Sequence, residues 1–484
     1  MYKRIRTTTH TTTRTTTRTT THTTTHTTMH TTTHTAIPLL PLPDDLRTLA
    51  RVLRNPSAFL LDLCCMAGDI ARLRAGPIDL VCINRPDLVT SVLIEHARNL
   101  EKMPAVKTLR AFTGDGLLVS DGDTWMRHRK LAAPAFHTQR IAGYQRVVAD
   151  VVRDALAEWR DGDLLDLEHT FKDLTLRIIS RTLFSIELDE VQRGLGDDID
   201  TALIYVNRLA GMSLFPFGAA LVPGARNGKA AIVRVDIAIR RLIAARRTDA
   251  ASHNDLLAML IDTRTAEGTA LSDDEIRDEV VTMFVAGHET VATVLTWLFY
   301  RLAREPRAAA ALQAEARTAP FASGDAPSLA QLEASPYALN VCREALRLYP
   351  GGFTIGRRAV RAFTVGEFEI DAGAWVIVSP FSVQRSTAAF ADPLAFIPER
   401  FDNDAQRNWP RGAYIPFGLG PRTCIGGQFA LMETHTVVAA LARALQFTDE
   451  TVGDAQVRPM IALSPDRTIT MRVRRLHKKN RGSE

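Results

Sequence analysis

A long uninterrupted helix between Ser272 and Pro306 is the feature that most constrains this fold. Ser272 can cap the helix with its hydroxyl, and Glu275 stands where a capping box needs a carboxylate. Acidic residues in the first turn also suit the positive end of the helix dipole. No proline follows before Pro306, so about 30 residues can form a helix roughly 45 Å long. Such a helix crosses a whole domain.

The middle of this helix carries an unusual segment, Met283-Phe-Val-Ala-Gly-His-Glu-Thr290. Two small residues, Ala286 and Gly287, interrupt an apolar face directly before a carboxylate and an alcohol. Such a gap lets a neighbouring helix pack closely, or lets another group approach the backbone. The residues alone favour the packing interpretation and leave the other open.

The rest of the chain predicts a mainly α protein with small β-sheets. Apolar residues at three- and four-residue spacing extend from Ile141 to Arg181 and from Asp255 to Leu312. No linker separates parts of residues 36–484, which favours one large domain. Alternating, strand-like patterns occur only in short pieces, at Ile78–Ile83, Phe363–Ile370, Trp375–Val378 and Thr468–Val473.

Residues 1–35 form a low-complexity segment of Thr, His and Arg with a four-residue repeat. They hold five basic residues and no acid, which equals the whole net charge of +5. The rest of the chain is therefore neutral and gives no sign of a nucleic-acid partner. Aligned histidines could bind a metal on a helix, but Thr is a poor helix former. We expect a disordered, dispensable tail.

The cysteines and the apolar segments bear on the compartment. Five cysteines are an odd number, and adjacent Cys64 and Cys65 are poorly placed to bridge each other. A reducing compartment is the simpler interpretation. Neither a signal peptide nor a membrane span is recognisable, so we expect a cytoplasmic protein without a transmembrane anchor.

Near the C-terminus, a glycine-rich loop surrounds Cys424 and leads into a helix. Gly418 and Gly420 permit backbone conformations closed to other residues, so that amides can fold over the sulfur. The helix dipole and Arg422 should further favour a thiolate. A lone cysteine is more often a small core residue, but these surroundings oppose that interpretation.

The spacing of these residues excludes three kinds of site. The loop has Thr423 where a dinucleotide fingerprint needs Gly, it lacks the Gly-Lys-Ser/Thr of a phosphate loop, and His288-Glu289 lacks the second histidine of a zinc protease. A thiol nucleophile and an axial ligand for a soft metal remain open.

Five motifs in order make the chain resemble the cytochrome P-450 family of haem-thiolate monooxygenases, from about residue 36 to the end. They are Trp125-x-x-x-Arg129, Ala286-Gly287-x-Glu289-Thr290, Glu344-x-x-Arg347, Pro398-Glu-Arg400-Phe401 and Phe417-x-x-Gly420-x-Arg422-x-Cys424-x-Gly426. The resemblance implies the family's fold, with the long helix over a haem b.

The resemblance assigns roles around this haem. Cys424 would be the iron ligand, shielded by Phe417, and Ala286 and Gly287 would leave room for oxygen. Cations and hydrogen-bond donors are needed for the haem propionates, because an unpaired buried carboxylate is costly. The resemblance places further haem-binding residues at Trp125, His128, Arg129, Arg357, Gly418, Arg422 and Gly426, with Arg357 preferred over Arg358.

The resemblance implies two further sets of functional residues, one for proton delivery and one for structural support. Glu289 and Thr290 match an acid-alcohol pair that delivers protons during oxygen activation, although a threonine in a helix also commonly bonds back to a carbonyl. Glu344, Arg347 and Arg400 match a buried ionic network with a structural role.

The resemblance also implies the substrate and the partner. The absence of charge among the expected pocket residues favours a hydrophobic fatty acyl, terpenoid or polyketide-type substrate. With no flavin or iron-sulfur motif in the chain, electrons would come from a ferredoxin or flavodoxin with its reductase, acting on a monomer. The alternatives are a peroxygenase, an isomerase, and a haem protein without turnover. The expected pocket residues are Leu117, Leu118, Phe284, Val285, Phe353, Thr354 and Ile355.

Overall fold

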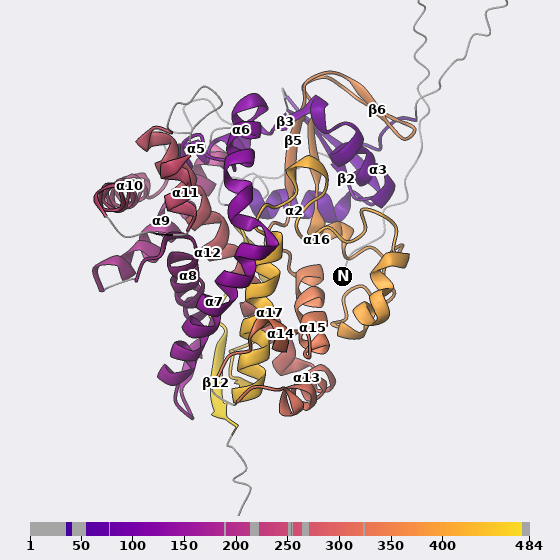
Figure 1. Cartoon of the computed structure of the whole chain (residues 1–484). Coiled ribbons are helices and arrows are strands. Elements are labelled where there is room, and N and C mark those ends of the chain that lie inside the picture. Colours follow the sequence, from indigo (N-terminus) through magenta and orange to yellow (C-terminus); the bar gives the residue numbers. More distant parts are fainter. Residues whose placement is uncertain are drawn as a thin grey trace, which may run out of the picture.

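The computed structural model describes residues 35–40, 55–76, 78–187, 190–212, 222–249, 253, 255–263, 271–322 and 325–476. These residues form a mainly helical molecule with four small sheets (Figure 1), which confirms the predicted fold class. Residues 1–34 of the predicted tail lie outside the described residues. Thr35 already pairs with the body, because its amide donates to the carbonyl of Glu367 at 2.9 Å.

The predicted long helix is α12, Asp273–Arg304, and its start is the expected capping box. The Ser272 amide donates to the Glu275 carboxylate at 2.9 Å, and the Glu275 amide donates to the Ser272 hydroxyl at 3.2 Å. In the described part of the chain, α12 alone has the length and composition to cross a membrane. Its most apolar stretch is 83% buried, as in the core helix of a folded domain.

The helical pattern predicted over residues 141–181 is two helices, α7 (Thr138–Glu158) and α8 (Leu167–Phe184). The chain turns between them at Gly162, where φ is +86°. Two helices that the sequence patterns did not single out, α9 (Glu190–Met212) and α10 (Ala225–Thr248), pack on each other. The remaining α-helices are α2 (Pro56–Met66), α3 (Pro86–Thr90), α4 (Pro104–Lys107), α5 (Arg110–Thr113), α6 (Gly122–Ala132), α11 (Leu256–Asp262), α13 (Pro306–Thr318), α14 (Leu329–Leu332), α15 (Pro336–Leu348), α16 (Pro380–Val383) and α17 (Gly427–Ala444).

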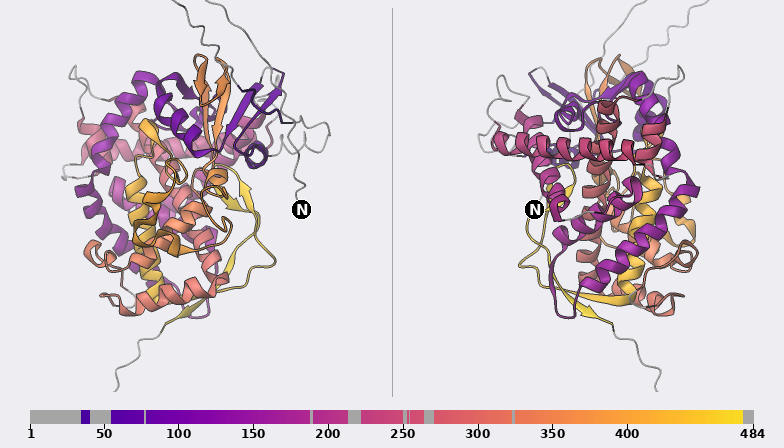
Figure 2. Two further views of the ribbon diagram at one scale, coloured as in Figure 1. Left: turned by 90° about the vertical axis from the view of Figure 1, so that its right-hand side faces the viewer. Right: turned by 60° about the vertical axis from the view of Figure 1, so that its left-hand side comes forward.

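The largest sheet has five strands and lies at one end of the molecule, beside the helices (Figure 2). Its order is β1 (Ile70–Ala75), β2 (Ile78–Ile83), β8 (Trp375–Val378), β5 (Ile355–Ala359) and β3 (Leu100–Lys102). The predicted strands at 78–83 and 375–378 have the expected bounds and pair in parallel. The strand predicted at 363–370 is instead a hairpin of β6 (Phe363–Val365) and β7 (Phe368–Ile370), because the chain turns at Gly366 with φ +55°. The smaller sheets contain β4 (Leu164–Asp166), β12 (Thr470–Arg475) and β9 (Leu445–Asp449), and the pair β10 (Val457–Pro459) and β11 (Leu463–Pro465).

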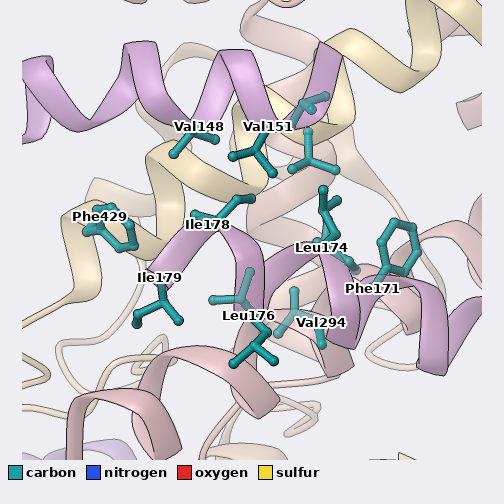
Figure 3. Close-up of a cluster of buried hydrophobic side chains, with 14 of the residues drawn as sticks. Val148, Val151, Phe171, Leu174, Leu176, Ile178, Ile179, Val294 and Phe429 are labelled. Carbon is teal, nitrogen blue, oxygen red and sulfur yellow. The ribbon is translucent and has the colours of Figure 1, made fainter. Parts of the chain in front are cut away.

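The main core lies where α7, α8, α12 and α17 meet. Figure 3 shows Val148 and Val151 of α7 facing Ile178 of α8, with Val294 of α12 and Phe429 of α17 nearby. Burial of these apolar side chains is the main favourable contribution to folding. The core therefore fixes α12 against the helices that border the functional site.

A buried ionic network ties α15 to the segment after it. Arg347 makes two hydrogen bonds to the carboxylate of Glu344, at 2.7 and 2.8 Å, and neither side chain is exposed. Arg347 also donates to the carbonyls of Gln384, Pro393 and Ala395. Arg400 lies 3.4 Å from the same carboxylate. The structure thus brings together the three residues expected to form a structural network.

Replacing Glu344 with Ala should destabilise the fold strongly. The change leaves the buried guanidinium of Arg347 without its carboxylate, and breaking a buried pair in this way costs about 3–5 kcal/mol. The urea unfolding midpoint, followed by circular dichroism, should fall accordingly. Glu333→Ala, which removes an exposed acid nearby, is the matched control; equal midpoints for the two variants would contradict the structural role of the network.

Candidate active site

A cavity of about 880 Å³ lies between α12 and the loop that carries Cys424. This volume is in the range of small-molecule sites in proteins. Ala286, Gly287 and Thr290 of α12 form one wall, and residues 416–419 and 422–426 form another. The two sequence segments with the strongest motifs thus border the same space.

Glycines give the Cys424 loop its shape. Gly418 and Gly420 have φ of +77° and +79°, which confirms the prediction that they adopt conformations unfavourable for other residues. A Cβ at Gly420 would also lie 2.0 Å from the carbonyl oxygen of Leu93. Phe417 lines the cavity and packs against Gly427, at the start of α17. The loop therefore holds Cys424 in the cavity wall, with its side chain exposed to the cavity.

The environment of the Cys424 thiol differs from the sequence expectation. Burial raises its pKa, and this outweighs the lowering by the Gly426 amide and by the charge of Arg129. Arg422, the expected cation, is bonded elsewhere, to Asp121 at 2.7 Å and to the carbonyl of Ser120 at 3.1 Å. The protein alone does not favour the thiolate here. A metal cation bound to the sulfur would, because coordination deprotonates a thiol.

Basic side chains gather at one end of the cavity. Arg129, Arg357 and Arg422 all line it, and the Arg422 guanidinium lies 4.3 Å from the ring centre of Trp125. Burial lowers the pKa of Arg357 to about 10 and also lowers that of Arg422. The neighbouring Arg358 instead turns outward and pairs with Glu101. The position of Arg357 in the cavity wall therefore agrees with the preference for Arg357 over Arg358 as a haem-binding residue.

Lys102 is a further cavity cation that the sequence motifs did not reveal. It lies opposite Arg357 in the register of β3 and β5, and burial, Arg357 and Arg422 hold its pKa well below the usual range. In the described part of the chain, no carboxylate forms an ion pair with Lys102 or Arg357. The negative charge of Asp121 acts on both side chains and raises the pKa of each, against the stronger effect of burial. The only sequence signal was a lone lysine ending a short strand, which is indistinguishable from a surface charge.

His128 does not line the cavity, contrary to its expected place among the haem-binding residues. It is buried on α6 with its Nδ1 atom 2.6 Å from the carboxylate of Glu279 on α12. The same carboxylate accepts a hydrogen bond from the amide of Leu117, at 2.9 Å. Its position indicates that His128 fixes α6 and the Leu117 loop against α12.

The Ala286-Gly287 gap of α12 does both things that the sequence left open: it lets a neighbouring helix pack closely, and it borders the cavity. A Cβ on Gly287 would lie 2.0 Å from Cδ1 of Ile179, so this glycine admits α8 closely. Gly287 and Ala286 also border the cavity. The Thr290 hydroxyl faces the cavity and donates to the Ala286 carbonyl at 2.7 Å, as in the common back-bond of helical threonines.

Glu289 is buried and lies behind this wall rather than in it. Burial raises the pKa of its carboxyl to about 7, although the charge of Lys172 on α8 acts in the opposite direction. The Lys172 ammonium is 2.7 Å from Asp200 of α9 and 3.4 Å from Glu168. One oxygen of Glu289 has no hydrogen-bond partner among the described residues.

Most of the expected pocket residues line the cavity. Phe284 does not, because it is on the opposite side of α12, stacked on Phe184 with ring centres 4.5 Å apart. It is therefore a core residue. The cavity-lining members of the predicted set are Leu117, Leu118, Val285, Phe353, Thr354 and Ile355.

These residues fit a planar, dianionic metal cofactor. Cys424 offers a soft ligand in the wall, and the positive charges of buried Lys102 and half-buried Arg357 require anions that the described residues do not supply. Haem meets both needs through its iron and its propionates.

The comparisons agree with this chemistry. The family model described as cytochrome P450 matches residues 48–470. The chain belongs to the cytochrome P450 family. It is accordingly a haem-dependent monooxygenase that needs an external source of electrons and acts on a hydrophobic substrate.

Similar proteins include several bacterial oxygenases. Cyclooctat-9-en-7-ol 5-monooxygenase of Streptomyces melanosporofaciens is 33% identical, over 80% of this chain and 84% of that protein. Pentalenene oxygenase of Streptomyces avermitilis is 29% identical, over 85% of this chain and 90% of that protein. Among solved structures, CYP175A1 from Thermus thermophillus is 28% identical, with a TM-score of 0.72 over 90% of this chain and all of that one.

Replacing Arg357 with Leu should weaken haem retention, since the change removes a half-buried cation of the cavity wall that would pair with a haem propionate. We expect at least about a tenfold faster loss of haem, equivalent to about 1.4 kcal/mol, measured by transfer of haem to apomyoglobin. Arg358→Leu removes the adjacent, outward-facing charge and should leave the rate unchanged. The same rate in both variants would contradict the assignment of Arg357.

Proposed function

We propose that this cytochrome P450 inserts one oxygen atom into a terpenoid, at a site bordered by Cys424, Thr290 and the apolar cavity wall. The observation that carries the proposal is that the Cys424 thiol and the Thr290 hydroxyl lie in different walls of one large apolar cavity, with Glu289 buried directly behind Thr290. The names of two similar proteins, a cyclooctat-9-en-7-ol monooxygenase and a pentalenene oxygenase, support a terpenoid substrate.

Haem held by Cys424 and the cationic end of the cavity would supply oxygen chemistry. The surrounding residues would do the rest. Leu117, Val285 and Phe353 are apolar side chains of the cavity wall that exclude water and hold a hydrocarbon skeleton. Trp125 and Arg422 would anchor the cofactor at its polar edge.

Proton supply is assigned to α12. The Thr290 hydroxyl donates its hydrogen to the Ala286 carbonyl, which leaves its oxygen free to accept a hydrogen bond from water in the cavity. The adjacent Glu289 has a pKa of about 7, the value at which a carboxyl both takes and gives protons at neutral pH. Its carboxyl feels the charges of an ion-paired group on α8 and α9, which consists of the half-buried side chains of Lys172, Asp200 and Glu168.

Two measurements test the function directly. The reduced, carbon-monoxide-bound protein should show the thiolate-type shift of the Soret band, and Cys424→Ser should lose it. With labelled dioxygen, the product should contain one labelled oxygen atom. An unshifted band in folded, haem-loaded protein would refute Cys424 as the ligand, and a product oxygen from water would refute monooxygenation.

Thr290→Ala should uncouple electron consumption from product formation. Loss of the hydroxyl removes the group that orders water beside the cavity, so reducing equivalents should appear as hydrogen peroxide. Thr296→Ala removes a hydroxyl that makes the same back-bond, to Ala292 at 2.8 Å, but lies in the core. Coupling should be normal in that control; equal coupling in both variants would exclude a role for Thr290.

Glu289→Gln should slow turnover by roughly 10²-fold, the usual contribution of a general acid. It should also alter the pH dependence of stability. The folded carboxyl binds its proton more tightly than the ordinary value of 4.5, so the wild-type free energy of unfolding falls as pH rises from 4.5 to about 7. This decline should flatten in the variant. An unchanged slope would show that Glu289 is ionised throughout.

We also infer a small acidic ferredoxin or flavodoxin as the electron donor, to a monomer in the cytoplasm. The free thiols of all five cysteines support a reducing compartment. Lys130 supports a docking role, because it is exposed on α6 directly after Arg129, a cavity residue.

Lys130→Glu should therefore slow association with a ferredoxin several-fold at low salt, with a smaller effect at high salt. Stopped-flow reduction of the haem measures this rate. Lys229→Glu, an exposed charge on α10, should not change it. An equal effect of both substitutions would point to net charge rather than to this surface.

A further inference from the structure

A pair of polar residues, Ser57 and Asn207, interrupts an otherwise apolar wall of the cavity. This wall is formed by α2, α9 and the turn between β10 and β11, and carries neither Cys424 nor the cationic group. Its apolar members include Phe59, Leu60 and Val206. A single polar position in an apolar wall can orient a ligand through one polar group.

Close packing of two helices creates this pair. A Cβ on Gly211 would lie 2.7 Å from Cγ of Pro56, so glycine lets α9 approach the start of α2. Asn207 is one helical turn before Gly211 and lies on the same face of α9. The approach therefore brings its amide to Ser57, whose hydroxyl donates to Oδ1 at 2.7 Å.

The other end of the Asn207 amide lacks a strong acceptor. Its Nδ2 atom carries two hydrogens, and its hydrogen-bond partner among the described residues is the sulfur of Met460, at 3.7 Å. A thioether is a weak acceptor, and this one is also approached by Nδ2 of Asn55 at 3.9 Å. Asn207 is only 7% exposed. A buried amide N–H with so weak an acceptor lacks a full hydrogen bond. An oxygen atom of a ligand would supply the missing acceptor.

The pair presents a donor and an acceptor together. Nδ2 of Asn207 can donate, and the Ser57 oxygen keeps lone pairs because its hydrogen goes to Oδ1. An alcohol matches both, since its hydroxyl accepts one hydrogen bond and donates another. A hydrocarbon matches neither and would leave the amide buried without a partner.

We propose that Asn207 and Ser57 form a hydroxyl-binding subsite, so that the substrate is a terpenoid alcohol and the enzyme adds a further oxygen. The inference rests on the proposed function for the terpenoid class. The preceding reaction must then be one that installs a hydroxyl on the hydrocarbon skeleton, such as a hydroxylation or the capture of water by a carbocation.

The test compares matched ligand pairs on the haem-loaded enzyme. The pairs are borneol with bornane, cedrol with cedrane, and phytol with its parent hydrocarbon phytene, with dissociation constants from calorimetry. At least one alcohol should bind tenfold or more tightly than its hydrocarbon. A preference below twofold in every pair would overturn the proposal, whatever the result of the labelled-dioxygen experiment.

Two variants then locate the preference. Asn207→Leu, of similar size, should abolish it by weakening the alcohol and sparing the hydrocarbon, and Ser57→Ala should reduce it without disturbing α9. Leu60→Ala, in the same wall, should weaken both members of a pair equally. A preference that survives both polar substitutions would place the recognition elsewhere and refute the subsite. A preference lost with a normal carbon monoxide spectrum would support it independently of the catalytic assignments.

Discussion

Positive charge without matching negative charge, at one end of an apolar cavity, is the constraint on which the functional structure depends. Lys102 and Arg357 lie opposite each other on paired strands, Lys102 buried and Arg357 half-buried, and Asp121 is the acid whose charge acts on both. A fold keeps such a group only if a ligand completes it. Haem would do so with its propionates, and its iron would stabilise the Cys424 thiolate, which burial alone disfavours. On this assignment, haem binding would stabilise the folded protein both at Cys424 and at the cationic end of the cavity.

The long helix α12 holds the adjacent residues Glu289 and Thr290 in two different environments. Successive residues of a helix point about 100° apart, so Thr290 faces the cavity while Glu289 points away from it and feels the charge of half-buried Lys172 on α8. The carboxyl thus feels the charge of Lys172 from behind the wall, and it places no charge of its own in the apolar pocket. The same rotation puts Val285 in the cavity wall and Phe284 in the core against Phe184.

Much of the site could be predicted because its motifs are local. The glycines around Cys424, the capping box of α12 and the pairing of Glu344 with Arg347 all depend on residues within one turn or loop. The errors have a common cause. The resemblance placed His128 among the haem-binding residues, but its ring lies against the carboxylate of Glu279, which is far from it along the chain. Arg422 was expected to act on the thiol, but Asp121 holds it away.

The sequence by itself determined the family, the main helices, the loop around Cys424 and the apolar character of the pocket, because periodicity and glycine positions act over a few residues. Only the tertiary structure decided which charges meet at the cavity and which polar groups remain without a strong partner. The register of β3 with β5 places Lys102 opposite Arg357 in the cavity. The close approach of α9 to α2 at Gly211 brings the Asn207 amide to Ser57. Burial and pairing of side chains depend on elements far apart in the chain, and no local pattern records them.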